Sequence, residues 1–242
     1  MNSLDTRPPE FAWLDREDAH SQQLVRRVLR GEHSIYEQLF DRYFERARRY
    51  ALVRVGTEQH AQDAALAAFA EVFELLQSGR QPAWPFRSWL LRYVRVQAIR
   101  LAAVTSRSGP VDDVVRRSLA DAVRLGDAPM VQTSSDADLL AGIDRLSPHQ
   151  QEALFLRFQA GHTVPEIARV LRLSPRAVTR LLAQAVTALD EEPVAQRNGR
   201  GASRKDQAQM TRHECVRPVV RARQYGLVAY KGGGERASKR WP

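Results

Sequence analysis

The stretch Leu146–Leu189 contains three helix starts in succession, which restricts it to short helices joined by tight turns. At each start, a Ser or Thr side chain can accept a hydrogen bond from an unpaired backbone N–H. A proline lies in the first turn, where no donor is needed. The three capping residues are Ser147, Thr163 and Ser174. Apolar residues recur at helical spacing after each of them, so the stretch predicts three amphipathic helices.

Only Arg172 and Leu173 separate the second helix from the third, which predicts a helix-turn-helix. Arg and Gln can each form two hydrogen bonds to a base edge, and Ser or Thr can bond a base or a phosphate. The third helix is therefore a candidate recognition helix for the major groove of DNA. The alternative is an ordinary three-helix unit with a solvated polar face. The candidate DNA-binding residues are Arg172, Ser174, Arg176, Thr179, Arg180 and Gln184.

The segment EIARVLRLSPRAVTRLL resembles region 4 of the sigma-70 family, in particular the extracytoplasmic-function (ECF) sigma factors. The preceding IDRLSPHQQEALFLRFQAGHT is similar to the lead-in of that region. The family usually has Gly in the turn, whereas this chain has Arg172, at a cost of about 1 kcal/mol for a left-handed residue. The resemblance implies that the third helix binds the −35 promoter element and that region 4 contacts the β flap of RNA polymerase.

The net charge of +9 lies entirely in the C-terminal segment 193–242, which has 12 basic and 3 acidic residues. Residues 1–192 hold 37 − 12 = 25 basic and 28 − 3 = 25 acidic side chains, which cancel. Few apolar groups are present in 193–242, so we expect a disordered basic tail. Such a tail can add nonspecific affinity for DNA or RNA. The alternative is a solvated tail without a role.

Several classes of protein are excluded by motif and composition. The sequence has no P-loop, no GxSxG and no HExxH motif, so we do not expect an enzyme. No apolar run approaches the roughly 20 residues of a membrane span, and the acidic N-terminus is unlike a secretory signal, so the expected location is cytoplasmic. The single Cys215 excludes an internal disulfide, and Cys215 with His213 is too small a set for a metal site. We expect neither a metal nor a cofactor.

Helical periodicity extends over most of the chain, and the predicted fold class is all-α, with two small helical domains. The expected parts are a flexible leader (1–20), a helical domain (21–105), a linker (106–137), a helix-turn-helix domain (138–192) and the basic tail (193–242).

The predicted helix Phe86–Val104 places aromatic side chains beside arginines, a pattern that suits stacking on unpaired bases. The alternative is a core stripe with solvated arginines. The order of the parts resembles regions 2 and 4 of an ECF sigma factor. In that family region 2 captures a flipped base of the −10 element. The resemblance implies −10 contacts by Arg87, Trp89, Arg92, Tyr93, Arg95, Val96 and Arg100.

Region 2 of the family also binds a coiled coil of the polymerase β′ subunit. The resemblance assigns this contact to Asp63, Leu66, Ala67 and Phe69 on the predicted helix Glu58–Leu76. Leu66 and Ala67 replace a Gln-Glu pair of the family, and Val96 replaces an Asn. These changes remove two polar groups from the polymerase-binding surface and one base-contacting group.

Three hypotheses follow from this comparison. The first is an alternative sigma factor that binds core RNA polymerase and promoter DNA. The second is a sigma-like helix-turn-helix regulator that no longer engages polymerase, which the changes at Leu66, Ala67 and Val96 favour. The third is an interaction module that titrates an anti-sigma protein. The family resemblance implies an anti-sigma partner, although no residue identifies one.

Overall fold

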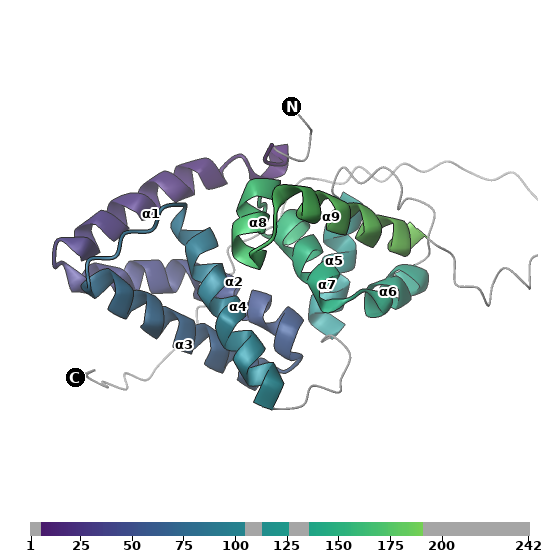
Figure 1. Ribbon diagram of the computed structural model, residues 1–242, viewed down its shortest axis with the longest axis horizontal. Coiled ribbons are helices and arrows are strands. Elements are labelled where there is room, and N and C mark those ends of the chain that lie inside the picture. Colours follow the sequence, from purple (N-terminus) through teal and green to yellow (C-terminus); the bar gives the residue numbers. More distant parts are fainter. Residues whose placement is uncertain (1–5, 105–112, 126–135, 191–242) are drawn as a thin grey trace, which may run out of the picture. The chain divides into compact units, whose positions relative to one another are not determined.

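The computed structural model describes residues 6–104, 113–125 and 136–190, and all regular elements within these ranges are helical (Figure 1). The predicted all-α fold class is therefore confirmed. The basic tail 193–242, with His213 and Cys215, lies outside the described residues. Within the described ranges, no helix is both long enough and apolar enough to cross a membrane.

The N-terminal part consists of four helices. They are α1 (Leu14–Leu29), α2 (Tyr36–Val55), α3 (Glu58–Gln77) and α4 (Phe86–Val104), with short 3-10 turns at Pro9–Phe11 and His33–Ile35. Helices α2, α3 and α4 all contact one another. Alanines along α3, such as Ala61, Ala64 and Ala68, are fully buried and allow the neighbouring helices to approach closely.

The flexible leader expected over residues 1–20 was wrong for its second half, because α1 begins at Leu14. The leucine side chain is only 2% exposed, and burying it favours an ordered helix start. Further along α1, the Ser21 hydroxyl lies 2.6 Å from the Tyr43 hydroxyl, which fixes α1 against α2.

The C-terminal part contains the predicted helix-turn-helix. Its helices are α6 (Asp136–Arg145), α7 (Pro148–Leu154), a π-helical turn (Phe155–Gln159), α8 (Val164–Leu171) and α9 (Pro175–Asp190). The expected linker 106–137 contains a further helix, α5 (Asp113–Leu125). Burial of Leu119 and Val123 holds α5 against the C-terminal part, where it contacts α6 and the π-helical turn.

The predicted helix starts are confirmed at all three positions. Ser147 and Thr163 each form a capping box with the residue three positions later. The Ser174 hydroxyl accepts a hydrogen bond from the Ala177 N–H at 3.2 Å. Arg172 adopts the left-handed conformation expected for the turn, with φ 60° and ψ 42°.

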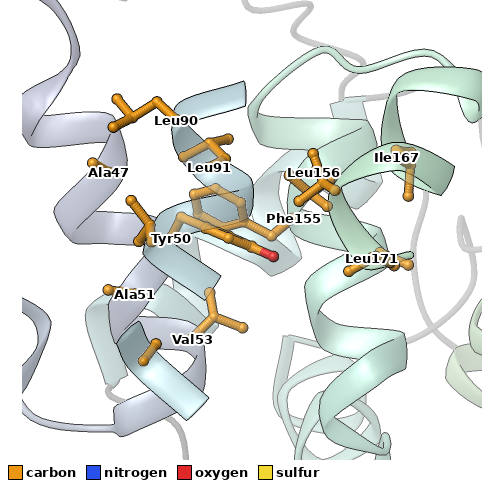
Figure 2. Packing of buried hydrophobic residues seen from close by; sticks show 14 of the residues in the cluster. Ala47, Tyr50, Ala51, Val53, Leu90, Leu91, Phe155, Leu156, Ile167 and Leu171 are labelled. Carbon is orange, nitrogen blue, oxygen red and sulfur yellow. The ribbon is translucent and has the colours of Figure 1, made fainter. Parts of the chain in front are cut away.

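The N-terminal part (α1–α4) and the C-terminal part (α6–α9) lie within one compact unit. Helix α4 contacts α8, and α2 contacts α7. Figure 2 shows the centre of this interface, where the Tyr50 and Phe155 rings lie 5.7 Å apart. The division into separate domains at 21–105 and 138–192 remains a prediction.

Candidate nucleic-acid interface

The polar face of α9 remains accessible in this arrangement. Val178, Leu182 and Ala185 point into the core and orient α9. The opposite side leaves Arg176, Arg180 and Gln184 exposed, while Thr179 is half-buried and its hydroxyl donates to the Pro175 carbonyl at 3.1 Å. Arg172 and Ser174 are exposed at the preceding turn. All six predicted −35 residues therefore lie on one helix or at its start.

A basic groove adjoins the start of α9 and is formed by both parts of the chain. Arg92 of α4 lies on one side, and Arg169 and Arg172 of the helix-turn-helix lie on the other. The Arg92 and Arg169 guanidinium carbons lie 5.5 Å and 5.6 Å from the centre of the Trp84 ring. Cation–π contacts of this kind hold the two arginines in place. None of the three arginines pairs with a carboxylate within the described part of the chain.

Helix α4 contains four arginines and no acidic residue, but the structure separates its predicted −10 residues by exposure. Arg87 and Trp89 are only 2% and 5% exposed. Arg100 is exposed, and the half-buried members are Arg92, Tyr93, Arg95 and Val96. Contact of Arg87 or Trp89 with DNA therefore requires a neighbouring element to move away.

Arg87 is covered by α8, through the buried carboxylate of Glu166, and by α1, through Asp18. Arg87 Nη2 donates to Glu166 Oε1 at 2.5 Å, and Arg87 Nε donates to Asp18 at 2.9 Å. Arg7 joins from the N-terminus, donating to Glu166 Oε1 at 3.1 Å and to the Gly161 carbonyl at 2.6 Å. This network links α1, α4 and α8 in a single ion-pair cluster.

Glu166 has two roles, one for each carboxylate oxygen. Oε2 accepts the Thr163 N–H at 2.8 Å and so completes the cap of α8, while Oε1 accepts the arginines. Burial of this carboxyl disfavours its charged form, but the charge of Arg87, added to smaller contributions that include the Thr163 N–H and Arg7, outweighs burial, and the pKa of Glu166 falls to about 2. Glu166 is therefore ionised throughout the physiological range.

A second buried glutamate makes an equivalent contact further along the interface. Glu152 of α7 is 1% exposed, and its Oε2 lies 3.3 Å from Arg95 Nε and 3.6 Å from Arg54 Nη1. Arg95 also lies 3.1 Å from the His149 ring. Thus two glutamates of the C-terminal part face three arginines of α2 and α4.

The predicted polymerase-binding residues divide between surface and core. Asp63, Leu66 and Ala67 are exposed on one side of α3. Phe69 is 2% exposed and packs against Tyr36 and Phe40, so any contribution to polymerase binding is indirect.

Sequence reasoning treated Glu166 only as a capping residue and did not single out Glu152. The available signal was that Glu152 directly precedes four apolar residues, Ala153–Leu156, because a carboxylate buried beside them requires a partner. Arg7 was missed because nothing in its local sequence indicates a partner 154 positions away. Among the described residues, no cluster of three or more His, Cys, Asp or Glu could hold a metal ion.

Comparison with known proteins identifies the class to which this fold and site belong. A family model described as ECF sigma factor matches residues 19–193. The ECF RNA polymerase sigma factor BldN of Streptomyces coelicolor is 30% identical over 183 residues, covering 72% of this chain and 66% of BldN. The chain belongs to the ECF sigma factor family.

One solved structure, that of CnrH, shows the same fold. CnrH, solved in complex with the cytosolic domain of CnrY, is 21% identical, covering 74% of this chain and 97% of CnrH, with a TM-score of 0.50. RpoE from Bartonella quintana, solved with the anti-sigma factor NepR, is 16% identical, covering 64% of this chain and 93% of RpoE, with a TM-score of 0.46.

Proposed function

We propose that the protein is an alternative sigma factor of the ECF group that binds core RNA polymerase and directs initiation at specific promoters. The observation that supports this most directly is the exposed face of α9. It follows a tight turn at Arg172 and presents Arg176 and Arg180. In this proposal the protein acts in the cytoplasm, by binding DNA and capturing a base, and it carries out no covalent chemistry.

Promoter recognition in this proposal uses two surfaces. The face of α9 binds the −35 element in the major groove, with arginines that can contact guanine through two hydrogen bonds. The aromatic and arginine side chains of α4 bind the −10 strand, where Trp89, Arg92 and Tyr93 suit stacking and phosphate contact.

Polymerase binding in this proposal uses the exposed side of α3, with Asp63, Leu66 and Ala67. Leu66 is 41% exposed, which is unusual for a large apolar residue without a partner surface. We propose that it packs on the polymerase β′ coiled coil in place of the polar pair of the family, while the C-terminal part contacts the β flap. Family membership also supports an anti-sigma partner.

Co-elution with bacterial core RNA polymerase on a sizing column tests this function. We expect a stoichiometric complex with the full-length protein. Leu66→Asp, which adds a charge to the exposed side of α3, should weaken the complex, whereas Gln38→Asp on the exposed surface of α2 is the matched control. Failure of the folded wild-type protein to co-elute would contradict the proposal.

The second candidate is a sigma-like DNA-binding regulator that does not engage polymerase. Leu66 and Ala67 favour it because they lack the hydrogen-bonding groups of the family's Gln-Glu pair. Promoter binding without polymerase co-elution is the result expected from this alternative.

The role of α9 predicts a sequence-specific loss for Arg180→Ala. We expect binding to a cognate −35 duplex to weaken by about 1–3 kcal/mol, because a base contact is lost. Binding to random duplex should change much less, and Arg42→Ala on the exposed surface of α2 is the matched control. Fluorescence anisotropy measures both affinities, and an equal loss on both duplexes would assign Arg180 to the DNA backbone.

A further inference from the structure

A cavity of about 150 Å³ lies between α2, α4 and the turn that follows the π-helical segment. Apolar side chains form much of its wall, and three of them, Leu90, Leu91 and Phe155, can be followed in Figure 2. Protein cores are packed with few voids larger than a water molecule, so a space of this size is unusual inside a small helical protein. A cavity of about this volume admits a molecule the size of benzene.

Two buried nitrogen atoms of the lining residues have no hydrogen-bond partner in the part of the chain that the structure describes. Arg87 uses Nε for Asp18 and Nη2 for Glu166, which leaves Nη1 unpaired. The second atom is Nε2 of His162, a residue that is only 1% exposed. Leaving a buried polar atom unpaired costs free energy, which a molecule held in the cavity can recover.

The two nitrogens require opposite hydrogen-bond partners. Arg87 can only donate. His162 Nδ1 lies 3.1 Å from the Ala160 carbonyl, so Nδ1 carries the proton of the neutral ring and Nε2 is left as an acceptor. Burial and the charge of Arg87 hold the pKa of His162 well below 6.5, which keeps the ring neutral. A ligand group must therefore accept from Arg87 and donate to His162, and a hydroxyl group does both through one atom.

The local backbone explains why His162 lies at the cavity. The π-helical turn ends at Ala160, and Gly161 then adopts the left-handed conformation with φ 62°. The His162 N–H donates to the Leu156 carbonyl at 2.8 Å, which fixes the chain after the turn. Single π-helical turns occur frequently at functional sites, so this geometry supports a site here independently of the unpaired atoms.

The remaining walls suit an aromatic ring and an entrance from solvent. Tyr43 of α2 and Phe155 offer aromatic surface to a bound ring. Arg46 and Arg49 also line the cavity, but their side chains are 37% and 58% exposed, so they lie on its solvent side. The cavity therefore has a polar inner end, an aromatic wall and a mouth bordered by flexible cationic side chains.

We propose that this cavity is a binding site for a small phenol, a molecule with one aromatic ring and a hydroxyl group. The hydroxyl accepts a hydrogen bond from Arg87 Nη1 and donates one to His162 Nε2, while the ring packs between Tyr43 and Phe155. This inference goes beyond the proposed promoter-binding function, because it gives the protein a small-molecule ligand. A phenol in the cavity stabilises the folded chain, since the unfolded chain has no such site.

The first test measures recognition of the hydroxyl. Isothermal titration calorimetry gives the affinities of phenol and of toluene, which has a similar shape and no hydroxyl, for the full-length protein and for His162→Phe. The ratio of the two affinities cancels the different hydrophobicity of the ligands. We expect saturable binding of phenol to the wild-type chain and a ratio that favours phenol about tenfold less in His162→Phe, because its hydroxyl loses the acceptor. No saturable binding of phenol, or an unchanged ratio, would overturn the proposal.

The second test fills the cavity. Ala160 lies in its wall and is half-buried, so Ala160→Leu places three more carbon atoms there. Ala19→Leu, the same change on the exposed surface of α1, is the matched control. At a phenol concentration of about ten times Kd, we expect the thermal midpoint of the wild-type chain and the control to rise by about 3–6 °C. The midpoint of Ala160→Leu should not rise.

An equal rise in Ala160→Leu would overturn the proposal, because phenol would then bind elsewhere. Circular dichroism confirms that each variant is folded, and if His162→Phe is not, the comparison of Ala160→Leu with Ala19→Leu decides the question. Neither test contains DNA or polymerase. A failure of the phenol site is therefore distinct from a failure of the proposed function, which co-elution with polymerase measures.

Discussion

At the scale of single residues, the charged groups at the interface depend on one another. The Arg87 guanidinium donates hydrogen bonds to both Asp18 and Glu166, and Arg7 contacts both of these carboxylates. Burial raises the pKa of Asp18, opposed by Arg87, whereas the pKa of Glu166 is lowered. Arg87 lowers the pKa of both carboxyls, but burial prevails at Asp18, whereas at Glu166 the added Thr163 N–H hydrogen bond and the neighbouring cations outweigh burial.

His162 lies beside this cluster and predicts a pH dependence of stability. Burial, together with the charges of Arg87 and Arg7, holds the pKa of His162 well below its usual value of 6.5, against the opposing effects of Glu166 and the Ala160 carbonyl. The folded protein thus keeps this ring neutral, while the unfolded chain takes up a proton below pH 6.5. Stability should fall as the pH is lowered from 7.5 to 5.5, with a limiting slope of about 1.4 kcal/mol per pH unit for one proton.

Urea unfolding at several pH values measures this slope for the wild-type protein and for His162→Gln. The variant cannot take up the proton, so its stability should depend less on pH over the same range. The difference between the two chains cancels the contributions of the carboxylates. Equal slopes would mean that His162 is not the responsible group.

At the scale of elements, the helix-turn-helix shows how local sequence specifies local structure. The caps at Ser147, Thr163 and Ser174 all form, because each requires only atoms within three residues of itself. The turn between α8 and α9 likewise depends on one residue, Arg172, and on the bond from the Leu173 N–H to the Ala168 carbonyl at 3.0 Å.

The left-handed conformation of Arg172 predicts that glycine at this position stabilises the fold. A non-glycine residue at φ 60° pays a steric cost, so Arg172→Gly should raise the free energy of unfolding by about 1 kcal/mol. Arg169→Gly, in the last turn of α8, is the matched control and should lose about 1 kcal/mol of stability. Urea denaturation measures both, and destabilisation by Arg172→Gly would contradict the predicted strain.

At the scale of the whole molecule, charge is distributed unequally along the chain. Residues 1–192 are neutral overall, and the excess of +9 belongs to 193–242. Inside the neutral body, the arginines of α2 and α4 are compensated by glutamates far away in the sequence. Binding to DNA in the absence of polymerase should therefore depend strongly on the tail.

Deletion of residues 193–242 tests that dependence. We expect a shallower fall of affinity for random duplex DNA with increasing salt, because fewer counterions are released on binding. A full-length variant with Gln in place of the 12 Lys and Arg residues of the tail separates charge from length. If the truncated chain shows the same dependence of DNA affinity on salt as the wild-type chain, the tail does not contribute to nonspecific DNA binding.

The sequence by itself determined the helices, their caps, the left-handed turn and the family, because these depend on neighbouring residues and on short motifs. It also placed the polar face of α9 correctly on the surface, since amphipathic spacing separates the buried side of a helix from the exposed side. It left open whether the arginines of α4 are solvated or bound. Only the tertiary structure decided that Arg87 and Arg95 meet Glu166 and Glu152, because those pairs lie 79 and 57 positions apart. Pairing over such separations depends on how whole helices pack, and no local pattern specifies it.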